Sequence, residues 1–295
     1  MNFSSDNFRG AALMAASMAA FVLNDTLIKL ASENLSLFQA VFLRGLFTTA
    51  FISLVAWYKR VLFHPIIKAD RRILVFRVAA EIGATLCFLT ALFNMPIANA
   101  TAILQALPLA VTLCAAMFLG EPVGWRRYLA IIIGFIGILI IIRPGSDGFN
   151  AYSFWAMGAV CFVVIRDLTT RRLSPQVPSL LVALMTSVAI TITGALLSPT
   201  MEWKPVTGHS LTLLGSAAVF LIFGYLFSIM TMRVGEISFI SPFRYTNLIW
   251  AIIIGIVIFG EIPDGWTLIG SAIVVVMGIY TFYRERVRLR EECKS

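Results

Sequence analysis

Long apolar runs separated by short polar breaks are the main pattern of this sequence. Each run has about the 20 residues that a helix needs to cross the hydrocarbon core of a bilayer. The runs lie near residues 10–31, 37–57, 72–92, 98–119, 128–143, 151–170, 178–197, 210–230, 238–259 and 266–283. Turn-forming residues mark the breaks, for example Arg143-Pro144-Gly145. The pattern predicts an all-α integral membrane protein with ten transmembrane helices.

The composition agrees with a membrane protein and narrows the function. Of the 295 residues, 59% are hydrophobic and 13% are charged, and the mean hydropathy is +0.90. The predicted loops are too short to hold a soluble domain. The sequence has no HExxH, GxSxG or phosphate-binding-loop motif, and its only histidines, His64 and His209, fall in predicted loops. We therefore expect no catalytic residues, no cofactor and no metal.

The basic residues are sorted to one side of the predicted helices. With the amino terminus inside, sixteen of the 23 Lys and Arg residues fall in cytoplasmic segments, and only Arg143 and Lys204 fall in external ones. This asymmetry follows the positive-inside rule. It predicts a multi-pass protein of a bacterial-type inner membrane with both termini in the cytoplasm. The partner of the positive charge is then the lipid bilayer, and no nucleic acid is expected.

Two stretches about 140 residues apart share a pattern. The first covers residues 97–122 and ends in Gly120-Glu121, and the second covers 237–262 and ends in Gly260-Glu261. Five predicted helices per half, an odd number, place the second copy in the membrane in the opposite sense, as in many secondary transporters. We therefore expect repeats at 1–145 and 146–295, the second with a basic cytoplasmic tail. The alternative is a coincidence between two Gly-Glu helix ends.

These features resemble the EamA-type branch of the drug/metabolite transporter (DMT) superfamily. The resemblance rests on the two Gly-Glu helix ends with the aromatic residue and glycine-rich span that follow each, on the segment from Asn24-Asp25 to Lys29, and on Phe243-Arg244-Tyr245. It covers nearly the whole chain. It implies ten helices as two inverted five-helix repeats around a central cavity, and transport of amino acids, vitamins, nucleotide-like metabolites or similar compounds.

Ionisable and polar side chains inside the predicted spans are the candidates for contact with a solute. A charge in the bilayer costs about 2.5 to 3.5 kcal/mol on insertion scales, so such groups usually face a wet cavity or one another. Arg77 and Glu81 are four residues apart and can pair on one helix face. Arg44 and Arg244 have no acidic residue three or four positions away. We predict the following substrate-binding residues: Asn24, Asp25, Arg44, Glu81, Gln105, Arg244, Tyr245 and Asn247.

Two partners are open for Arg44 and Arg244. One is a cross-helix pairing with Asp25 or Glu81, and the other is an anionic group on the solute, to which a guanidinium offers two parallel donors. Tyr245 either packs against other helices or flanks a planar group of the solute. Gln105 occupies the position of the first repeat that matches Tyr245, so the two side chains are expected to face one cavity.

The predicted function is a secondary transporter that moves a small organic metabolite across the inner membrane by alternating access. An amino acid or related compound with an anionic group is the first choice of solute, and a larger planar metabolite such as a flavin or adenosyl compound is the alternative. A membrane-embedded enzyme or a channel is the alternative of another class. Asp25 and Glu81 are candidate carriers of a coupling proton, with uniport and exchange left open. A monomer is expected, and a dimer is the alternative.

Overall fold

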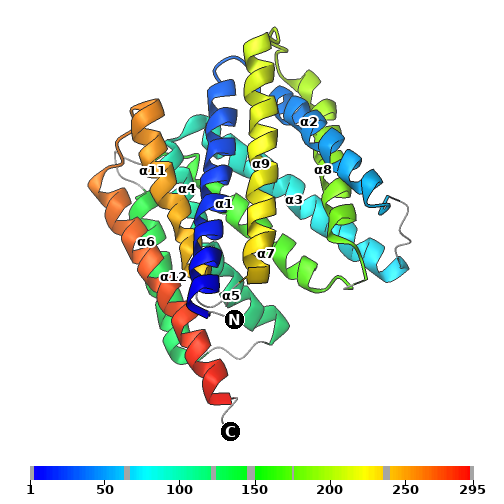
Figure 1. Cartoon of the computed structure of the whole chain (residues 1–295). Coiled ribbons are helices and arrows are strands. Elements are labelled where there is room, and N and C mark those ends of the chain that lie inside the picture. The colour runs from blue at the N-terminus through cyan, green and yellow to red at the C-terminus, as the bar shows by residue number, and fades with distance from the viewer. Residues whose placement is uncertain are drawn as a thin grey trace. The chain divides into compact units, whose positions relative to one another are not determined.

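The computed structural model describes residues 3–62, 67–120, 124–144, 150–174, 176–234 and 240–292. These residues form helices and no strand (Figure 1). The helices are α1 (Phe3–Ala31), α2 (Leu37–Tyr58), α3 (Lys68–Asn94), α4 (Ile97–Leu104), α5 (Leu107–Leu119), α6 (Trp125–Ile142), α7 (Ser153–Arg171), α8 (Ser179–Leu197), η1 (Ser198–Thr200), α9 (Gly208–Val234), η2 (Ser241–Tyr245), α11 (Thr246–Phe259) and α12 (Gly265–Glu292).

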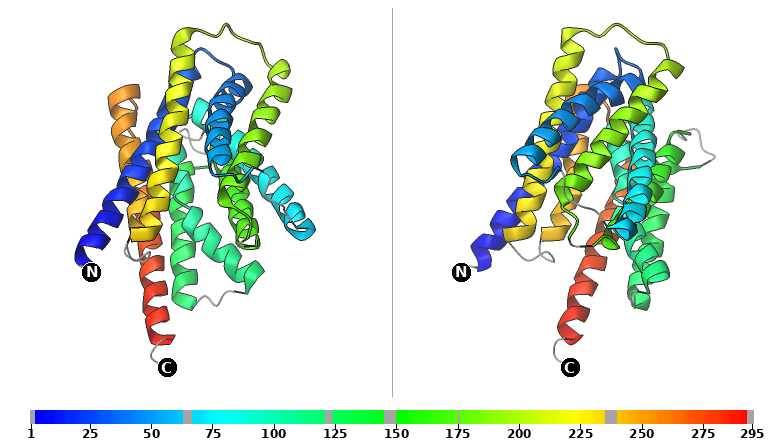
Figure 2. Two further views of the ribbon diagram at one scale, coloured as in Figure 1. Left: turned by 45° about the vertical axis from the view of Figure 1, so that its right-hand side comes forward. Right: turned by 90° about the vertical axis from the view of Figure 1, so that its right-hand side faces the viewer.

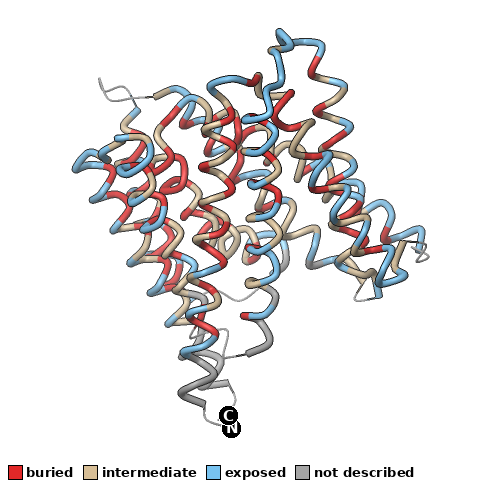
Figure 3. The backbone as a smooth tube through the Cα atoms, turned by 45° about the horizontal axis from the view of Figure 1, so that its top comes forward, coloured by how far each residue is buried: buried red, intermediate tan, exposed pale blue. Residues whose placement is uncertain are grey.

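Ten helical segments of the described residues are long and apolar enough to cross a membrane. They agree with the ten predicted runs to within a few residues, except that the predicted start of the ninth run at 238 lies outside the described residues. Helices suit the bilayer because every backbone N–H and C=O is satisfied within the segment. Buried and exposed positions alternate along the helices, so each turns one face toward its neighbours (Figure 3). The predicted fold class of a ten-helix membrane protein is confirmed.

Three of the ten spans consist of two helical segments each, and one of them, the seventh, is α8 continued by η1. The fourth span is α4 and α5, separated by a turn at Gln105 and Ala106, and the ninth is η2 followed by α11. Pro108 lies in the first turn of α5, and Pro242 lies in the first turn of η2. Because proline has no N–H to donate to the preceding turn, it favours an interruption of the helix at these places.

Several helix ends recur 140 positions along the chain. α9 begins and ends 140 positions after α3, and α12 begins 140 positions after α6. α5 and α11 both end at a glycine in the left-handed region, Gly120 with φ 67° and Gly260 with φ 64°, where a side chain would be strained. Glu121 and residues 237–239 of the repeated stretches lie outside the described residues.

The chain forms two compact units. Unit 1 comprises Met1–Leu23, Met95–Met157 and Phe220–Ser295, and unit 2 comprises Asn24–Asn94 and Gly158–Val219. Three of the four boundaries between the units fall within α1, α7 and α9, and the fourth directly follows the end of α3. Each unit therefore combines segments from both halves of the sequence.

In unit 1, α6 and α12 pack along each other (Figure 1). A Cβ on Gly137 would lie 2.9 Å from the carbonyl oxygen of Gly270, and a Cβ on Gly270 would lie 2.6 Å from the carbonyl oxygen of Gly137. The two backbones touch because neither residue has a side chain, as small residues allow in membrane helices. Gly134 faces Met277 further along, so residue numbers rise on α6 as they fall on α12. The two helices are antiparallel.

In unit 2, α2 and α8 pack in the same manner (Figure 2). A Cβ on Gly45 would meet Thr191, and a Cβ on Gly194 would lie 2.7 Å from the backbone nitrogen of Phe42. These helices are also antiparallel. The hydroxyl of Thr49 bonds to that of Thr191 at 3.0 Å and to that of Ser187 at 2.7 Å, which places a polar seam between them.

The loop before α12 is held by Asp264, which lies outside the membrane spans. Its carboxylate accepts a hydrogen bond of 2.8 Å from the backbone N–H of Thr267 and pairs with the guanidinium of Arg143. Partial burial raises the pKa of Asp264, but the hydrogen bonds from Thr267 and the charge of Arg143 lower it by more, so the pKa lies below its ordinary value. This pair fixes the end of α6 to the start of α12.

Candidate functional site

A charged cluster in unit 2 joins α1 to α2. Asn24 is 3% exposed, and its Nδ2 donates a hydrogen bond of 2.9 Å to Oδ1 of Asp25. The guanidinium of Arg44 acts electrostatically on the Asp25 carboxylate. Asp25 is one of the two partners that the sequence offered for Arg44. Arg44 is half-buried beside Gly45, whose close approach to α8 fixes this part of α2.

A second charged cluster in unit 2 joins α3, α7 and α8. Oε1 of Glu81 lies 3.1 Å from Nη1 of Arg166, and Oε2 of Glu81 lies 3.8 Å from Nη2 of Arg77. Arg77 also donates to the hydroxyl of Thr186 at 2.8 Å and to that of Thr170 at 3.0 Å. The pairing of Arg77 with Glu81 confirms the sequence prediction, whereas the bond from Arg166 to Glu81 was not predicted. In this structure Glu81 is a junction between helices.

The breaks in the fourth and ninth spans, both in unit 1, carry the remaining predicted residues. Gln105 is 7% exposed and Tyr245 is 4% exposed, and Asn247 is half-buried. Nε2 of Gln105, Oη of Tyr245 and Oδ1 of Asn247 have no hydrogen-bond partner in the described part of the chain. Buried polar atoms without partners are costly and rare. Such atoms at two helix breaks can be satisfied by a polar ligand or by water.

Tyr245 and Arg244 differ in their surroundings although they are neighbours. The phenol of Tyr245 fills the space above Gly278 of α12, where a Cβ would fall directly on its oxygen. Arg244 is exposed. Arg44 belongs to unit 2 and Arg244 to unit 1. The aromatic position of the candidate site is therefore fixed by packing, and the guanidinium beside it is accessible.

Glu261 has a structural role that the sequence did not indicate. Its Oε2 accepts a hydrogen bond of 2.9 Å from the backbone N–H of Ile97, the first residue of α4. A carboxylate at a helix N-terminus satisfies a free N–H and interacts favourably with the helix dipole. The Gly-Glu end of α11 thus holds the start of the broken fourth span. The repeated motif pointed to Glu261 but not to its partner.

Among the described residues, no group of three or more His, Cys, Asp or Glu side chains is placed to hold a metal ion. The polar groups of the clusters and helix breaks described above are amides, hydroxyls, a phenol and paired charges.

Comparison with known proteins gives a matching family and relatives that are named as transporters. Residues 8–143 match the EamA-like transporter family. An S-adenosylmethionine uptake transporter of Rickettsia felis is 24% identical over 282 residues, which cover 92% of each chain. A riboflavin transporter of Vibrio cholerae is 29% identical over 216 residues, or 72% of each chain. The pseudopaline exporter CntI of Pseudomonas aeruginosa is 25% identical over 90% of this chain and 93% of its own.

A solved crystal structure has the same fold. It is 19% identical in sequence, has a TM-score of 0.63, and the match covers 94% of this chain and 98% of that one. The relatives are named as transporters and align along most of the ten-span chain. The chain is a multi-pass membrane transporter, and its residues 8–143 match the EamA-like transporter family.

Proposed function

We propose that this transporter moves a small organic metabolite with a planar ring system and a polar or charged group, such as an adenosyl or flavin compound, across the bacterial inner membrane. The observation that carries the proposal is the set of unpaired buried polar atoms at the two helix breaks, on Gln105, Tyr245 and Asn247. In transporters, solute sites are typically formed by discontinuous membrane helices near the midplane.

Tyr245 favours a planar solute. A buried phenol combines an aromatic face for stacking with a hydroxyl for a hydrogen bond. Two of the relatives are named for S-adenosylmethionine and for riboflavin, and both compounds contain planar rings. The sequence alone placed amino acids first, and the relatives favour the planar class instead.

The charges in unit 2 are a separate set of candidate contacts for a solute. Asp25, Asn24 and Arg44 lie in predicted spans, where an ionised group is retained only at a substantial cost in free energy. Arg44 suits an anionic group of the solute and Asp25 suits a cationic one. Asp25 and Glu81 also remain our candidates for a coupling proton. A pH gradient imposed on the vesicles described below tests that role.

Alternating access by two inverted repeats is part of the proposal. Inversion requires that a helix and its counterpart run in opposite directions across the membrane. α6 and its counterpart α12 are antiparallel within unit 1, and α2 and its counterpart α8 are antiparallel within unit 2. Both packings support repeats at 1–145 and 146–295 of opposite sense. A transport cycle by one monomer, with both termini in the cytoplasm, is consistent with this arrangement.

The test is transport into proteoliposomes with two variants that each remove an unpaired atom. Tyr245→Phe deletes only the hydroxyl, which has no partner in the described part of the chain, and Gln105→Leu deletes the unpaired Nε2 together with Oε1. The thermal stability of Tyr245→Phe is expected to stay equal or to rise. Transport of the identified solute is expected to fall by about ten-fold or more, because a hydrogen bond to the solute is lost. Gln176→Leu, at an exposed loop position, serves as the control.

The solute panel contains S-adenosylmethionine, riboflavin and a set of amino acids. Uptake or efflux of a planar compound but of no amino acid supports the proposal. Transport of amino acids but of no planar compound contradicts the proposed solute class and supports the amino-acid class that the sequence placed first. Unchanged transport in both Gln105→Leu and Tyr245→Phe would refute the site assignment, whatever the solute.

A further inference from the structure

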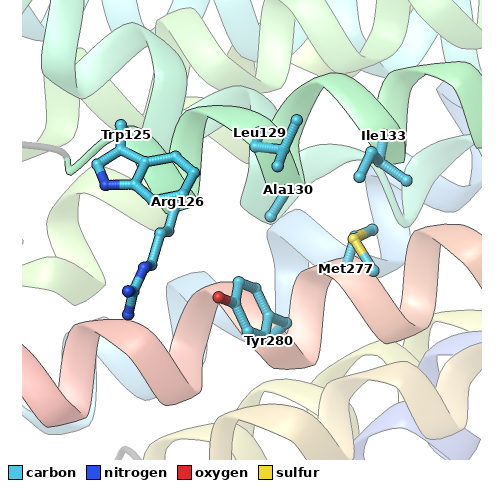
Figure 4. A pocket seen from close by; sticks show the side chains of 7 residues that line it. All are labelled: Trp125, Arg126, Leu129, Ala130, Ile133, Met277 and Tyr280. Atoms are coloured by element: carbon cyan, nitrogen blue, oxygen red, sulfur yellow. The ribbon is translucent and has the colours of Figure 1, made fainter.

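A groove of about 260 Å³ lies between α6 and α12 in unit 1 (Figure 4). Leu129, Ala130 and Ile133 of α6 form one wall, and Met277 and Tyr280 of α12 form the other. The wall residues are almost entirely apolar, and Leu129 is 49% exposed. The groove exists because Ala130 presents only a methyl group between larger neighbours. It opens onto an apolar outer surface of the two helices.

One end of the groove carries a cation and an aromatic ring. Arg126 and Trp125 lie there, and the guanidinium carbon of Arg126 is 5.4 Å from the centre of the Trp125 ring. In Figure 4, the Arg126 side chain extends from α6 across the mouth of the groove toward α12. The ring orients the guanidinium by a cation–π interaction. Both residues are exposed.

The length of the groove along α6 is similar to the thickness of the hydrocarbon core of one bilayer leaflet. Trp125 and Arg126 are the first two residues of the span Trp125–Ile142, and Ile133 lies at its middle. Eight residues of helix between Trp125 and Ile133 rise about 12 Å, whereas half of the hydrocarbon core is about 15 Å thick. The charged end is therefore at the level of the lipid headgroups, and the apolar part runs to the bilayer centre.

We propose that this groove is a binding site for an anionic phospholipid. The phosphate accepts hydrogen bonds from the Arg126 guanidinium, which suits a bidentate contact with phosphate oxygens. One acyl chain lies along Leu129 and Ile133 against Met277. Trp125 and Tyr280 have an apolar body and a polar edge, as aromatic residues at the membrane interface do. Basic pockets between membrane helices are known to bind anionic headgroups. This site is separate from the proposed solute site and does not depend on it.

The experiment measures quenching of Trp125 by brominated lipids after reconstitution of the full chain. The Trp125 signal is the difference between the fluorescence of the natural protein and that of Trp125→Phe. Bilayers contain mixtures of phosphatidylglycerol and phosphatidylcholine, with bromine on the acyl chains of either lipid. Brominated phosphatidylglycerol is expected to quench Trp125 with a relative binding constant about five-fold above that of phosphatidylcholine, the effect of one basic residue near an anionic lipid.

Variants at Arg126 separate charge from fold. In Arg126→Gln, the ratio of the binding constants of phosphatidylglycerol and phosphatidylcholine is expected to fall to about one, so that no preference remains. Arg126→Lys is expected to keep most of the preference for phosphatidylglycerol. Arg72→Gln removes an exposed cation of unit 2 and is expected to leave the preference unchanged. Equal quenching by both lipids in the natural protein would overturn the proposal. A preference for phosphatidylglycerol that survives in Arg126→Gln would also overturn it. The same holds if neither lipid quenches Trp125 because a second copy of the chain covers the groove.

Discussion

At the scale of the residue, the ninth span shows how a missing side chain positions a residue of the proposed solute site. Tyr245 occupies the space that a side chain at Gly278 would take. Its hydroxyl has no hydrogen-bond partner in the described part of the chain, so packing alone holds the ring in place. The direction of the phenol therefore depends on the absence of a single Cβ on α12.

Gly278→Ala is expected to displace the Tyr245 ring and to impair transport. The added Cβ would overlap the phenol oxygen, and overpacking of this kind typically costs about 1 to 3 kcal/mol of stability. Transport of the solute should fall by at least the factor seen for Tyr245→Phe. Proteoliposome transport and thermal unfolding in detergent measure the two effects.

Gly265→Ala is the matched control, because a Cβ on Gly265, in the same helix, meets nothing within 4 Å. The double variant Tyr245→Ala, Gly278→Ala should lose less stability than the sum of the two single variants, since the clash is absent. Additive losses would show that Gly278 acts through something other than Tyr245.

At the scale of the element, the ten spans could be predicted because a bilayer imposes a length of about 20 apolar residues on each. The breaks within the fourth and ninth spans were not predicted. Pro108 and Pro242 were visible, but membrane helices tolerate proline, so the residue alone does not show an interruption. The bond from Arg166 to Glu81 was missed because a single sequence carries no distance between α7 and α3. The pairing of Arg77 with Glu81 was found because four residues of helix fix its geometry.

Removal of the Glu261 carboxylate is expected to loosen the first half of the fourth span. Glu261→Ala leaves the backbone N–H of Ile97 without its acceptor, and loss of a helix cap costs about 1 kcal/mol. Because Gln105 directly follows the end of α4, the transport rate should fall together with the stability. Glu261→Gln keeps an acceptor oxygen and should retain most of both. Glu202→Ala, at an exposed position, is the control. If Glu261→Gln were as damaging as Glu261→Ala, charge and not the cap would be the function of this residue.

At the scale of the whole molecule, two features of the chain bear on the proposed inverted duplication. Helix ends recur after 140 residues, and two helices pack antiparallel with their own counterparts, α6 with α12 and α2 with α8. A duplication without inversion would make counterparts run in the same direction across the membrane. The loop after α2 and the loop after α8 occupy matching positions of the two proposed repeats. Inversion therefore places them on opposite sides of the membrane.

Single cysteines in these two loops test the inversion. In a chain with Cys87, Cys114, Cys161 and Cys293 replaced, Lys59→Cys and Glu202→Cys introduce thiols at exposed positions of the two loops. The positive-inside rule places Lys59 in the cytoplasm and Glu202 outside. A membrane-impermeant maleimide should label Glu202→Cys in intact cells and Lys59→Cys only after permeabilisation. If Lys59→Cys were labelled in intact cells and Glu202→Cys only after permeabilisation, the predicted orientation of the chain would be reversed. The two repeats would still be inverted relative to each other. Labelling of both cysteines from one side would exclude inverted repeats, and with them an alternating-access mechanism built on the exchange of two equivalent halves.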